Sequence, residues 1–520
     1  MHPISSPALS PKTTPAPKAS GGPWRPRGES IYLIGIGGCG MSGLARMLRS
    51  RGAEVRGSDA NRSETTAALI VDDIPVTFDQ SAGQLPDETS LVIASAAIPA
   101  DHPEMLEADR RGLAVLTYAE AVGRCMQGLT AVAIAGTHGK STTAAMLGCA
   151  LTDAGLDPTV LVGANCPQLA LGALKPTNAS EGFARGSGFR LGAMEIPAGA
   201  LRGKPGVVIA ESCEFNRSFH RHHPVVASIG SVEADHLDIY GSLDAVVDAF
   251  REFASLLPPA SEGGKLLIAH EGAHRREVTA GLSCAVETIG FHPEADWVVS
   301  FDPATRQISV RKGRSAACAW TANMPGVHNA INAATAFVLG LSLGAEPSPL
   351  AQSLEAFTGL ERRCQFVGER RVGAKVGPPV RVYDDYGHHP TEIDATLRAL
   401  REHERPEDRG GRLICVFQPH QHSRTRFLLN EFASAFSQAD VVIVPQIYFV
   451  RDSEAEKQRV SAADLVERLR SDQVRAMHLH PFEAIVEQLE NLCRPGDLLV
   501  VMGAGPVWQV ARGYLAGTPA

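Results

Sequence analysis

The chain has 520 residues, of which 44% are hydrophobic and 20% are charged, and its formal net charge is −8. A chain of this length is too long to fold around a single hydrophobic core, so we expect three globular domains. The negative net charge gives no general attraction to nucleic acid, and no apolar run approaches the roughly 20 residues of a membrane-spanning helix. The composition therefore argues against nucleic-acid binding and against membrane insertion.

The first part of the chain is a segment of low complexity, which is followed by a strand and a glycine-rich turn. Residues 1–28 are rich in Pro, Ser, Ala and Gly and lack the apolar centre of a signal peptide, so we predict a disordered tail. From Ile31 the chain reads IYLIGIGGCGMSGLARMLRSRGAEVRGSD, which indicates a strand, a glycine turn, a helix and a second strand. Gly35, Gly37 and Gly40 fit the pattern G-x-G-x-x-G, which lets a phosphate approach the helix N-terminus. This motif alone is also compatible with an NAD-dependent oxidoreductase.

A phosphate-binding loop is predicted within the stretch AVAIAGTHGKSTTAAMLGCAL, which runs from Ala131 to Leu151. An apolar strand, a tight glycine turn and an Ala-rich helix follow one another in the order that such a loop requires. Lys140 would reach the β- and γ-phosphates, and the hydroxyl of Ser141 would bind Mg²⁺. The strict pattern G-x-x-x-x-G-K-[ST] asks for glycine where the chain has Ile134, so the loop is a variant. The sequence thus predicts hydrolysis of a nucleoside triphosphate or transfer from it.

The loop residues that we expect to surround the nucleotide phosphates are Gly136, Thr137, His138, Gly139, Lys140, Ser141 and Thr142. The ten cysteines of the chain are scattered, without a CxxC pair or the spacing of a zinc site. Together with a nucleotide site, this cysteine usage favours a cytoplasmic location.

Two acidic stretches follow the loop. Glu211 ends an apolar strand, residues 207–210, at the place where parallel sheets bind ligands, and could hold Mg²⁺. The stretch SVEADHLD then places three carboxylates around His236. The imidazole of His236 could ligate a second divalent ion. Acidic capping of a helix is the alternative, although it does not explain the histidine. Residues 166–206 are rich in Gly, Ala and Pro and are expected to form a long loop or an insertion.

Polar side chains begin the helix that is predicted after the sequence MPGV. His328, Asn329 and Asn332 share one helical end, and amide side chains suit the edge of a purine. Capping of the helix by asparagine is the alternative.

The last part of the chain alternates strands with helices, and its strands include VRVYDDY, RLICVFQ, DVVIVP and DLLVVMG. The first of these ends in Asp384, Asp385 and Tyr386, and two histidines follow. Such groups are costly to place at a strand end for packing alone. The second strand leads into a basic cluster whose guanidinium groups suit a carboxylate or a phosphate, although a basic surface loop is the alternative. The cluster comprises His420, His422, Arg424 and Arg426.

Strand–helix alternation along the whole chain, with further short strands at residues 91–94 and 114–116, predicts an α/β fold. We expect mostly parallel sheets that are covered by helices.

Nine stretches, in order along the chain, resemble the ATP-dependent Mur ligases of peptidoglycan synthesis. They are GIGGCGMSGLA, GSD, AGTHGKSTT, VEADHLD, PGVHNAINA, ERRCQFVGE, DDYGHHPTE, FQPHQHSRTR and MGAG. The resemblance covers almost everything from Ile31 onward. It implies an N-terminal Rossmann-like domain for the UDP-sugar (29–125), a central P-loop ATPase (126–360) and a C-terminal Rossmann-like domain that closes over the amino acid (361–520).

The stretch DDYGHHPTE resembles the alanine-adding branch of the family. The resemblance then implies that ATP, with Mg²⁺, phosphorylates the lactyl carboxylate of UDP-N-acetylmuramate to an acyl phosphate. The amine of L-alanine attacks this intermediate and phosphate leaves. Such a reaction needs charge neutralisation at the phosphoryl oxygens and close positioning of two substrates. We expect a monomer or a weak dimer.

The resemblance also implies roles for individual residues. Lys140 would contact the β- and γ-phosphates, Ser141 and Glu211 one Mg²⁺, and His236 the second Mg²⁺. Asn329 and Asn332 would contact adenine, with His328 beside them and Arg363 near the ATP. Tyr386, His388 and Arg424 would lie at the amino-acid substrate. The expected UDP-sugar pocket comprises Gly37, Gly38, Ser58 and Asp59. Of all these residues, Lys140, His236, His388 and Arg424 are the predicted catalytic groups.

The chain departs from the family pattern at three places. Gln421 and His422 stand where the family usually has Arg and Tyr, so one hydrogen bond to the amino-acid carboxylate is expected to be absent. The stretch ESCEFN lacks an Asp that the family usually has, and Gly230-Ser231 replaces Thr-Asn. Glycine and L-serine therefore stay open as acceptors. Two different functions also stay open, namely a ligase that recycles muropeptides by joining a tripeptide to UDP-N-acetylmuramate, and an inactive nucleotide-binding homologue.

Overall fold

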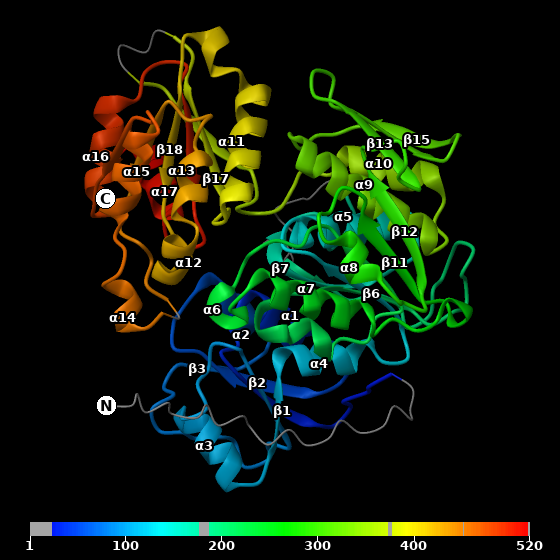
Figure 1. Cartoon of the computed structure of the whole chain (residues 1–520). Helices are drawn as coiled ribbons and strands as arrows, with labels where there is room; N and C mark the ends of the chain where they lie inside the picture. The colour runs from blue at the N-terminus through cyan, green and yellow to red at the C-terminus, as the bar shows by residue number, and fades with distance from the viewer. Residues whose placement is uncertain (1–22, 176–186, 373–376, 451, 518–520) are drawn as a thin grey trace.

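The computed structural model describes residues 23–175, 187–372, 377–450 and 452–517. Three β-sheets follow one another along the chain, and each is covered by helices (Figure 1). This arrangement confirms the predicted α/β, three-domain fold. Among the described residues, no helix has the length and apolar composition needed to cross a membrane.

The N-terminal domain contains a five-stranded parallel sheet with the order β3-β2-β1-β4-β5. Its strands are β1 (Ser30–Ile34), β2 (Glu54–Ser58), β3 (Val76–Thr77), β4 (Leu91–Ala94) and β5 (Ala114–Thr117). Its helices are α1 (Cys39–Ser50), α2 (Glu64–Val71), α3 (Pro103–Arg110) and α4 (Tyr118–Met126). Apolar residues at helical spacing, including Met41, Leu44 and Leu48, bury one face of α1. The predicted strand–turn–helix–strand unit at the start of this domain is confirmed.

The predicted tail, residues 1–28, falls mostly on residues 1–22, which lie outside the described part of the chain. Trp24 packs against the hydrophobic core of the N-terminal domain, and the guanidinium of Arg124 lies 5.8 Å from its ring centroid. The indole N–H of Trp24 donates a hydrogen bond to Glu29 at 3.3 Å. The end of the predicted tail is therefore held on the domain by packing.

The middle domain contains a ten-stranded sheet with the order β15-β14-β13-β12-β11-β10-β6-β9-β7-β8. The strands are β6 (Thr130–Ala135), β7 (Thr159–Cys166), β8 (Ser187–Arg190), β9 (Val207–Glu211), β10 (Val226–Ile229), β11 (Lys265–Ala269), β12 (Ala285–Gly290), β13 (Trp297–Asp302), β14 (Gln307–Lys312) and β15 (Ser315–Thr321). The interior strands are parallel, whereas β14, β15 and β8 pair antiparallel with their neighbours. Short connections join β13 to β14 and β14 to β15, which suits antiparallel pairing.

The helices of the middle domain are α5 (Lys140–Asp153), α6 (Leu237–Tyr240), α7 (Leu243–Ala254), α8 (Arg275–Thr279), α9 (Val327–Ser342) and α10 (Pro347–Ala356). The short 3₁₀ helices η1 (Phe215–Arg221) and η2 (Ala260–Glu262) lie between them. Helices α5, α9 and α10 bury one face of the sheet. The opposite face packs with α7 into a hydrophobic cluster that continues into the N-terminal domain. The first two domains thus share a core.

The Gly/Ala/Pro-rich stretch 166–206 contains one short strand in its described part. Strand β8 pairs with β7, and this hairpin contacts α1 of the N-terminal domain. A Cβ on Gly43 of α1 would lie 3.2 Å from the Cβ of Phe189, so the lack of a side chain permits the close approach. The predicted long loop is therefore interrupted by a strand that joins two domains.

The C-terminal domain contains a six-stranded sheet with the order β16-β17-β21-β18-β19-β20, in which only β16 is antiparallel among the described strands. The strands are β16 (Gln365–Arg370), β17 (Val380–Asp385), β18 (Leu413–Phe417), β19 (Val441–Val444), β20 (Ala476–His478) and β21 (Leu498–Met502). The helices are α11 (Pro390–Glu404), α12 (His422–Phe427), α13 (Leu429–Ser434), α14 (Glu454–Lys457), α15 (Ala462–Ser471), α16 (Phe482–Leu492) and α17 (Trp508–Ala516), with η3 at Pro406–Arg409. The central strands are apolar and buried throughout, as expected for parallel strands covered on both faces.

Candidate active site

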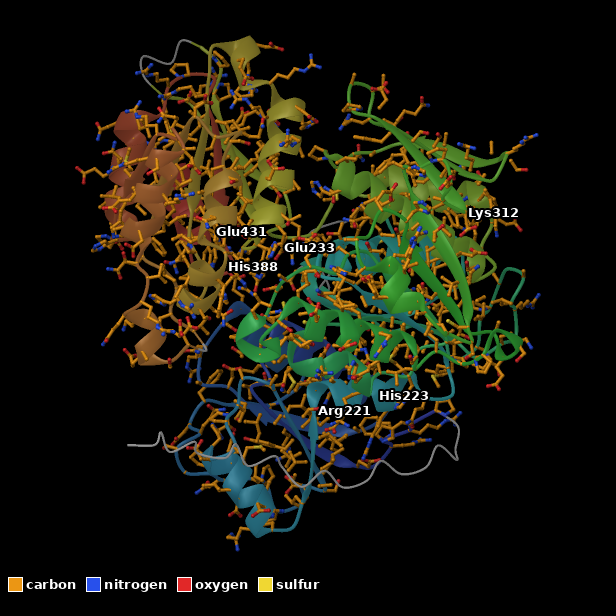
Figure 2. All side chains as sticks on the ribbon, in the orientation of Figure 1. Arg221, His223, Glu233, Lys312, His388 and Glu431 are labelled. Carbon is orange, nitrogen blue, oxygen red and sulfur yellow. The ribbon has the colours of Figure 1, made fainter. Side chains whose placement is uncertain are left out.

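A cavity of about 270 Å³ lies between the middle and C-terminal domains. Its walls come from the loop between β6 and α5, the end of β10, helix α9 and the start of α11. The carboxyl ends of parallel strands from both sheets meet here, which is where α/β proteins bind ligands. Glu233 of the middle domain and His388 of the C-terminal domain mark this junction in Figure 2.

The phosphate-binding loop has a backbone that requires glycine at two positions. Gly136 and Gly139 have φ angles of +127° and +76°. A Cβ on Gly139 would lie 2.4 Å from Oδ1 of Asn332, and one on Gly136 would lie 2.8 Å from the backbone nitrogen of Gly230. Helix α5 begins directly after this turn, at Lys140, so its first N–H groups are available to an anion. The local structure therefore fits a phosphate-binding loop despite Ile134.

Lys140 is held at the mouth of this loop by three oxygen atoms. Its ammonium donates hydrogen bonds to the carbonyls of Gly136 and Thr137 and to Oε2 of Glu214, at 2.6, 3.0 and 2.8 Å. Burial acts to lower the pKa of Lys140, but Glu214 outweighs this effect, so the pKa lies above its ordinary value. Lys140 is therefore a permanent cation beside the loop.

The predicted metal ligands form two groups near Lys140. Ser141 donates a hydrogen bond to Oε1 of Glu211 at 2.9 Å, and the other oxygen of Glu211 accepts one from the backbone of Gly163 at 2.7 Å. His236 forms a group with Glu214 and Asp235 whose ligand atoms all lie within 4.8 Å of one another. Nδ1 of His236 is buried without a hydrogen-bond partner. Carboxylate and hydroxyl oxygens with one orphaned imidazole nitrogen fit divalent cations.

The far end of the cavity is lined by residues of α9. His328, Asn329 and Asn332 all face it, together with the apolar side chains of Met324 and Ile331. The amide nitrogen of Asn329 donates to the carbonyl of Pro325 at 2.8 Å, and Asn329 also lines the cavity. The N-cap of α9 is Gly326, without a side-chain capping bond, so capping of this helix by asparagine is not observed. Burial lowers the pKa of His328 to about 4, which keeps its imidazole neutral. A mostly apolar space with neutral donors and acceptors suits a purine base.

The C-terminal domain contributes stacked and charged groups. The guanidinium groups of Arg362 and Arg363 lie 5.1 and 4.9 Å from the ring centroid of Tyr386. Arg363 also lies 3.8 Å from Oε1 of Glu392. Burial lowers the pKa of His388 to about 4, and its Nδ1 contacts the carbonyl of Tyr386 at 3.2 Å. Nε2 of His388 is therefore free to accept a hydrogen bond.

Arg424 reaches across the junction. Its Nε and Nη2 donate to Oδ1 of Asp235 at 3.0 and 2.9 Å, and its Nη1 contacts His420 at 3.2 Å. The side chains of Arg424 and Asp235 are only 6% and 9% exposed. The guanidinium of Arg424 lowers the pKa of Asp235, although burial acts in the opposite direction. A buried ion pair thus joins the two domains beside His236.

The residues predicted to bind the UDP-sugar lie at the β1–α1 turn. The backbone of Gly37 donates to Oδ2 of Asp59 at 2.9 Å, and Gly38 caps α1. The hydroxyl of Ser58 is fully buried and donates to Glu104 at 2.6 Å, while Glu104 also accepts a bond from Tyr32. The structure thus places the Ser58 side chain beneath the turn, and its role in the UDP-sugar pocket stays a prediction.

Sequence reasoning did not select four carboxylates that shape the site, namely Glu214, Glu233, Asp235 and Glu392. Each is paired with a cation or an imidazole of another element. Glu233 and Asp235 stand in the stretch SVEADHLD and Glu392 in DDYGHHPTE, but acidic capping of a helix also explains carboxylates at such positions.

A sheet with a phosphate-binding loop, enclosed between a Rossmann-like N-terminal domain and a C-terminal α/β domain, defines a multidomain nucleotide-binding protein. Family models match three successive regions of the chain. They are described as "Mur ligase family, catalytic domain" (residues 30–130), "Mur ligase middle domain" (134–340) and "Mur ligase, glutamate ligase domain" (362–505). The chain belongs to the Mur ligase family.

Curated relatives are similar to this chain along nearly its whole length. The UDP-N-acetylmuramate–L-alanine ligase of Agathobacter rectalis is 35% identical over 491 residues, which cover 93% of this chain and 97% of the relative. The enzyme of the same name from Rubrobacter xylanophilus is also 35% identical, with 94% and 99% of the two chains covered.

Solved structures show the same fold. The UDP-N-acetylmuramate–alanine ligase of Thermotoga maritima is 24% identical, has a TM-score of 0.72 and covers 94% of this chain and 98% of its own. A murein peptide ligase of Psychrobacter arcticus is 21% identical, has a TM-score of 0.68 and gives the same coverage. At these identities the likeness concerns the fold alone.

Proposed function

We propose that this chain joins L-alanine to the lactyl carboxylate of UDP-N-acetylmuramate with ATP, as the names of its curated relatives state for those proteins. The observation that carries the proposal is the junction itself. The ion pair between Asp235 and Arg424 brings a predicted amino-acid-binding residue next to His236, a predicted Mg²⁺ ligand. Two substrates held this close can react without diffusing apart.

The residues of the chain support an acyl-phosphate route. Lys140 and the first N–H groups of α5 would neutralise the phosphate oxygens during transfer. Ser141, Glu211 and His236 would hold Mg²⁺, which adds further charge neutralisation when bound. His388, kept neutral by burial, would accept a hydrogen bond from the attacking amine, and Arg424 would hold the carboxylate of the amino acid.

The remaining assignments rest on the same proposal. Adenine would bind against Asn332, His328 and the apolar wall of α9, and the UDP-sugar would bind at the β1–α1 turn. The three sheets support domain divisions at 29–125, 126–360 and 361–520. All ten cysteines are unpaired, which supports a reducing cytoplasm as the place of the reaction.

The test of acceptor identity is phosphate release with ATP, Mg²⁺ and UDP-N-acetylmuramate while the acceptor is varied. We expect kcat/KM for L-alanine to exceed that for glycine, L-serine or the tripeptide by about tenfold or more; for glycine, this is the range that one methyl group in a pocket provides. Omission of UDP-N-acetylmuramate is the control and should abolish the stimulation. A preference for the tripeptide would instead assign a recycling activity, and stimulation by no acceptor would favour an inactive nucleotide-binding homologue.

A further inference from the structure

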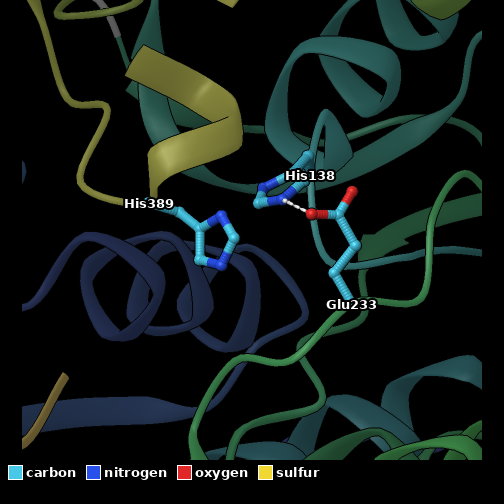
Figure 3. Close-up of side chains that lie close together, drawn as sticks. All are labelled: His138, Glu233 and His389. Carbon is cyan, nitrogen blue, oxygen red and sulfur yellow. Dashed lines mark hydrogen bonds and ion pairs between the residues drawn. The ribbon is translucent and has the colours of Figure 1, made fainter. Parts of the chain in front are cut away.

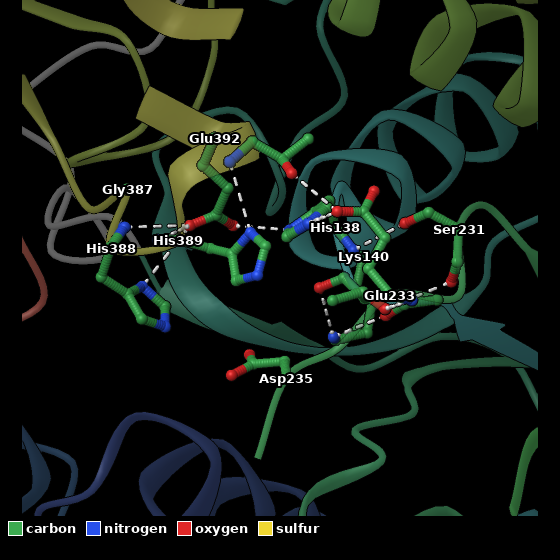
Figure 4. A network of polar contacts seen from close by, with 12 residues as sticks. His138, Lys140, Ser231, Glu233, Asp235, Gly387, His388, His389 and Glu392 are labelled. Atoms are coloured by element: carbon green, nitrogen blue, oxygen red, sulfur yellow. Dashed lines mark hydrogen bonds and ion pairs between the residues drawn. The ribbon is translucent and has the colours of Figure 1, made fainter. Parts of the chain in front are cut away.

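His138 belongs to the phosphate-binding loop, but its imidazole contacts carboxylates of two different domains (Figures 3 and 4). Nε2 lies 3.3 Å from Oε2 of Glu233, which follows β10 in the middle domain. Nδ1 lies 3.3 Å from Oε1 of Glu392, in the first turn of α11 in the C-terminal domain. His138 therefore links the nucleotide loop to the domain expected to close over the amino acid.

The geometry requires a charged imidazole. Carboxylates only accept hydrogen bonds, so both ring nitrogens of His138 must carry protons to bond both. Burial acts to lower the pKa of His138, but the bonds to Glu233 and Glu392 outweigh it and raise the pKa to about 9. The same contacts lower the pKa of Glu233 to about 2 against the effect of its burial. At neutral pH one cation is thus shared by two carboxylates.

Further contacts across the same junction depend on this arrangement. The hydroxyl of Thr391 donates to Oε2 of Glu233 at 2.6 Å, and Nε2 of His389 lies 3.4 Å from the carbonyl of Ala234. The rings of His138 and His389 pack with centroids 4.8 Å apart. Without the imidazolium, these contacts would bring Glu233 and Glu392 toward each other as like charges.

Glu392 also continues the connection into the predicted amino-acid site. Its Oε2 accepts a hydrogen bond from the backbone of His388 at 3.0 Å. The contacts therefore run from the loop through His138 and Glu392 to His388 without a gap.

We propose that His138 is a positioning residue, whose charge couples the phosphate-binding loop to closure of the C-terminal domain and so places His388 and Arg424 at the acceptor amino acid. The named acceptor rests on the proposed function, whereas the coupling of loop to closure does not.

The charge state of His138 gives closure a defined dependence on pH. The charged and titratable groups around its imidazole are Glu233, Glu392, His389, His328, Lys140 and Arg363. Closure raises the pKa of His138 above its ordinary value of about 6.5. The charged imidazole therefore stabilises the closed arrangement in full below that pH. This stabilisation is lost as the pH rises through about 9.

The test compares His138→Gln with the wild-type protein. Glutamine keeps a hydrogen-bonding group but removes the charge. We expect the KM for L-alanine to rise by about 30-fold, as for loss of one partner of a partly buried, hydrogen-bonded charge pair, and the Kd for a non-hydrolysable ATP analogue to rise by at least about fivefold less than this KM. From pH 8 to pH 10 the wild-type KM should rise relative to that of His138→Gln, a ratio in which the ionisation of the alanine amine cancels because both proteins share it. His223→Gln, at an exposed position away from the junction (Figure 2), is the matched control and should behave as wild type.

A second variant separates charge repulsion from damage to the loop. His138→Gln/Glu392→Gln removes one of the two opposing carboxylates. We expect its KM for L-alanine to be at least about fivefold lower than that of His138→Gln, because the like-charge repulsion is gone. Equal losses in nucleotide affinity and in KM, or a double variant no better than the single one, would overturn the proposal.

Small-angle X-ray scattering with the ATP analogue measures closure without a ligase assay. We expect the nucleotide to reduce the radius of gyration of the wild-type protein at pH 7 and not that of His138→Gln. If the wild-type protein closes but shows no ligase activity, the proposed function alone is contradicted. If the wild-type protein and His138→Gln close equally, the role of His138 alone is contradicted.

Discussion

Replacing Lys140 with alanine is expected to lower kcat for ATP-dependent phosphate release by about 10³-fold or more, the effect of removing a preorganised charge from a transferring group. Lys140 is the cation fixed at the mouth of the phosphate-binding loop by two backbone carbonyls and Glu214. No other residue of the loop carries a permanent positive charge. Steady-state phosphate release measures the loss, and a kcat within tenfold of wild type would contradict the role given to Lys140.

The same substitution leaves Glu214 buried without its partner, because the side chain of Glu214 is only 3% exposed. Loss of one partner of a buried ion pair costs about 3 kcal/mol of stability. The double variant Lys140→Ala/Glu214→Gln should regain most of this stability and none of the activity. Denaturant unfolding of both variants thus separates the structural effect from the catalytic one.

Replacing Arg424 with alanine is expected to raise the KM for L-alanine by about 10²-fold or more, because breaking a buried pair costs about 3–5 kcal/mol. The substitution removes the proposed carboxylate-binding group and also leaves Asp235 as an uncompensated buried charge between two domains. Initial rates at varied L-alanine and saturating ATP measure the change. An unchanged KM would exclude Arg424 from the amino-acid site.

Arg426 offers a matched control on the same helix. Its guanidinium pairs with Glu456 of the C-terminal domain, and both side chains are more exposed than those of the Arg424–Asp235 pair. Arg426→Ala is expected to change the KM for L-alanine by less than roughly twofold, as for other exposed ion pairs. A large effect there would show that α12 as a whole, and not the interdomain pair, sets acceptor binding.

The strands and the class of fold could be predicted from the sequence because parallel strands leave long apolar runs. The segments Leu91–Ala94 and Val207–Ala210 are buried strands in the structure, as their composition indicates. The antiparallel edge formed by β13, β14 and β15 was not foreseen. Strand β14 alternates in burial and is mostly polar, and β15 is largely exposed or half-buried, a pattern that resembles surface loops.

The site could be predicted where one segment carries the whole signal, as in the loop around Lys140. It could not be predicted where the contact joins distant segments. Nothing in the local sequence shows that Asp235 meets Arg424 or that His138 lies between Glu233 and Glu392, since each pair is more than 90 residues apart along the chain. The roles assigned to substrate- and metal-binding residues stay predictions, to which the structure adds proximity and charge.

The measurement that tests the central claim most directly follows oxygen from substrate to phosphate. UDP-N-acetylmuramate labelled with ¹⁸O in its lactyl carboxylate is incubated with ATP, Mg²⁺ and L-alanine, and the released phosphate and the amide product are analysed by mass spectrometry. The account predicts one labelled oxygen in each phosphate that is released and the L-alanine amide of the sugar nucleotide as product. Unlabelled phosphate, or label in AMP, would contradict transfer of the γ-phosphoryl group to the carboxylate.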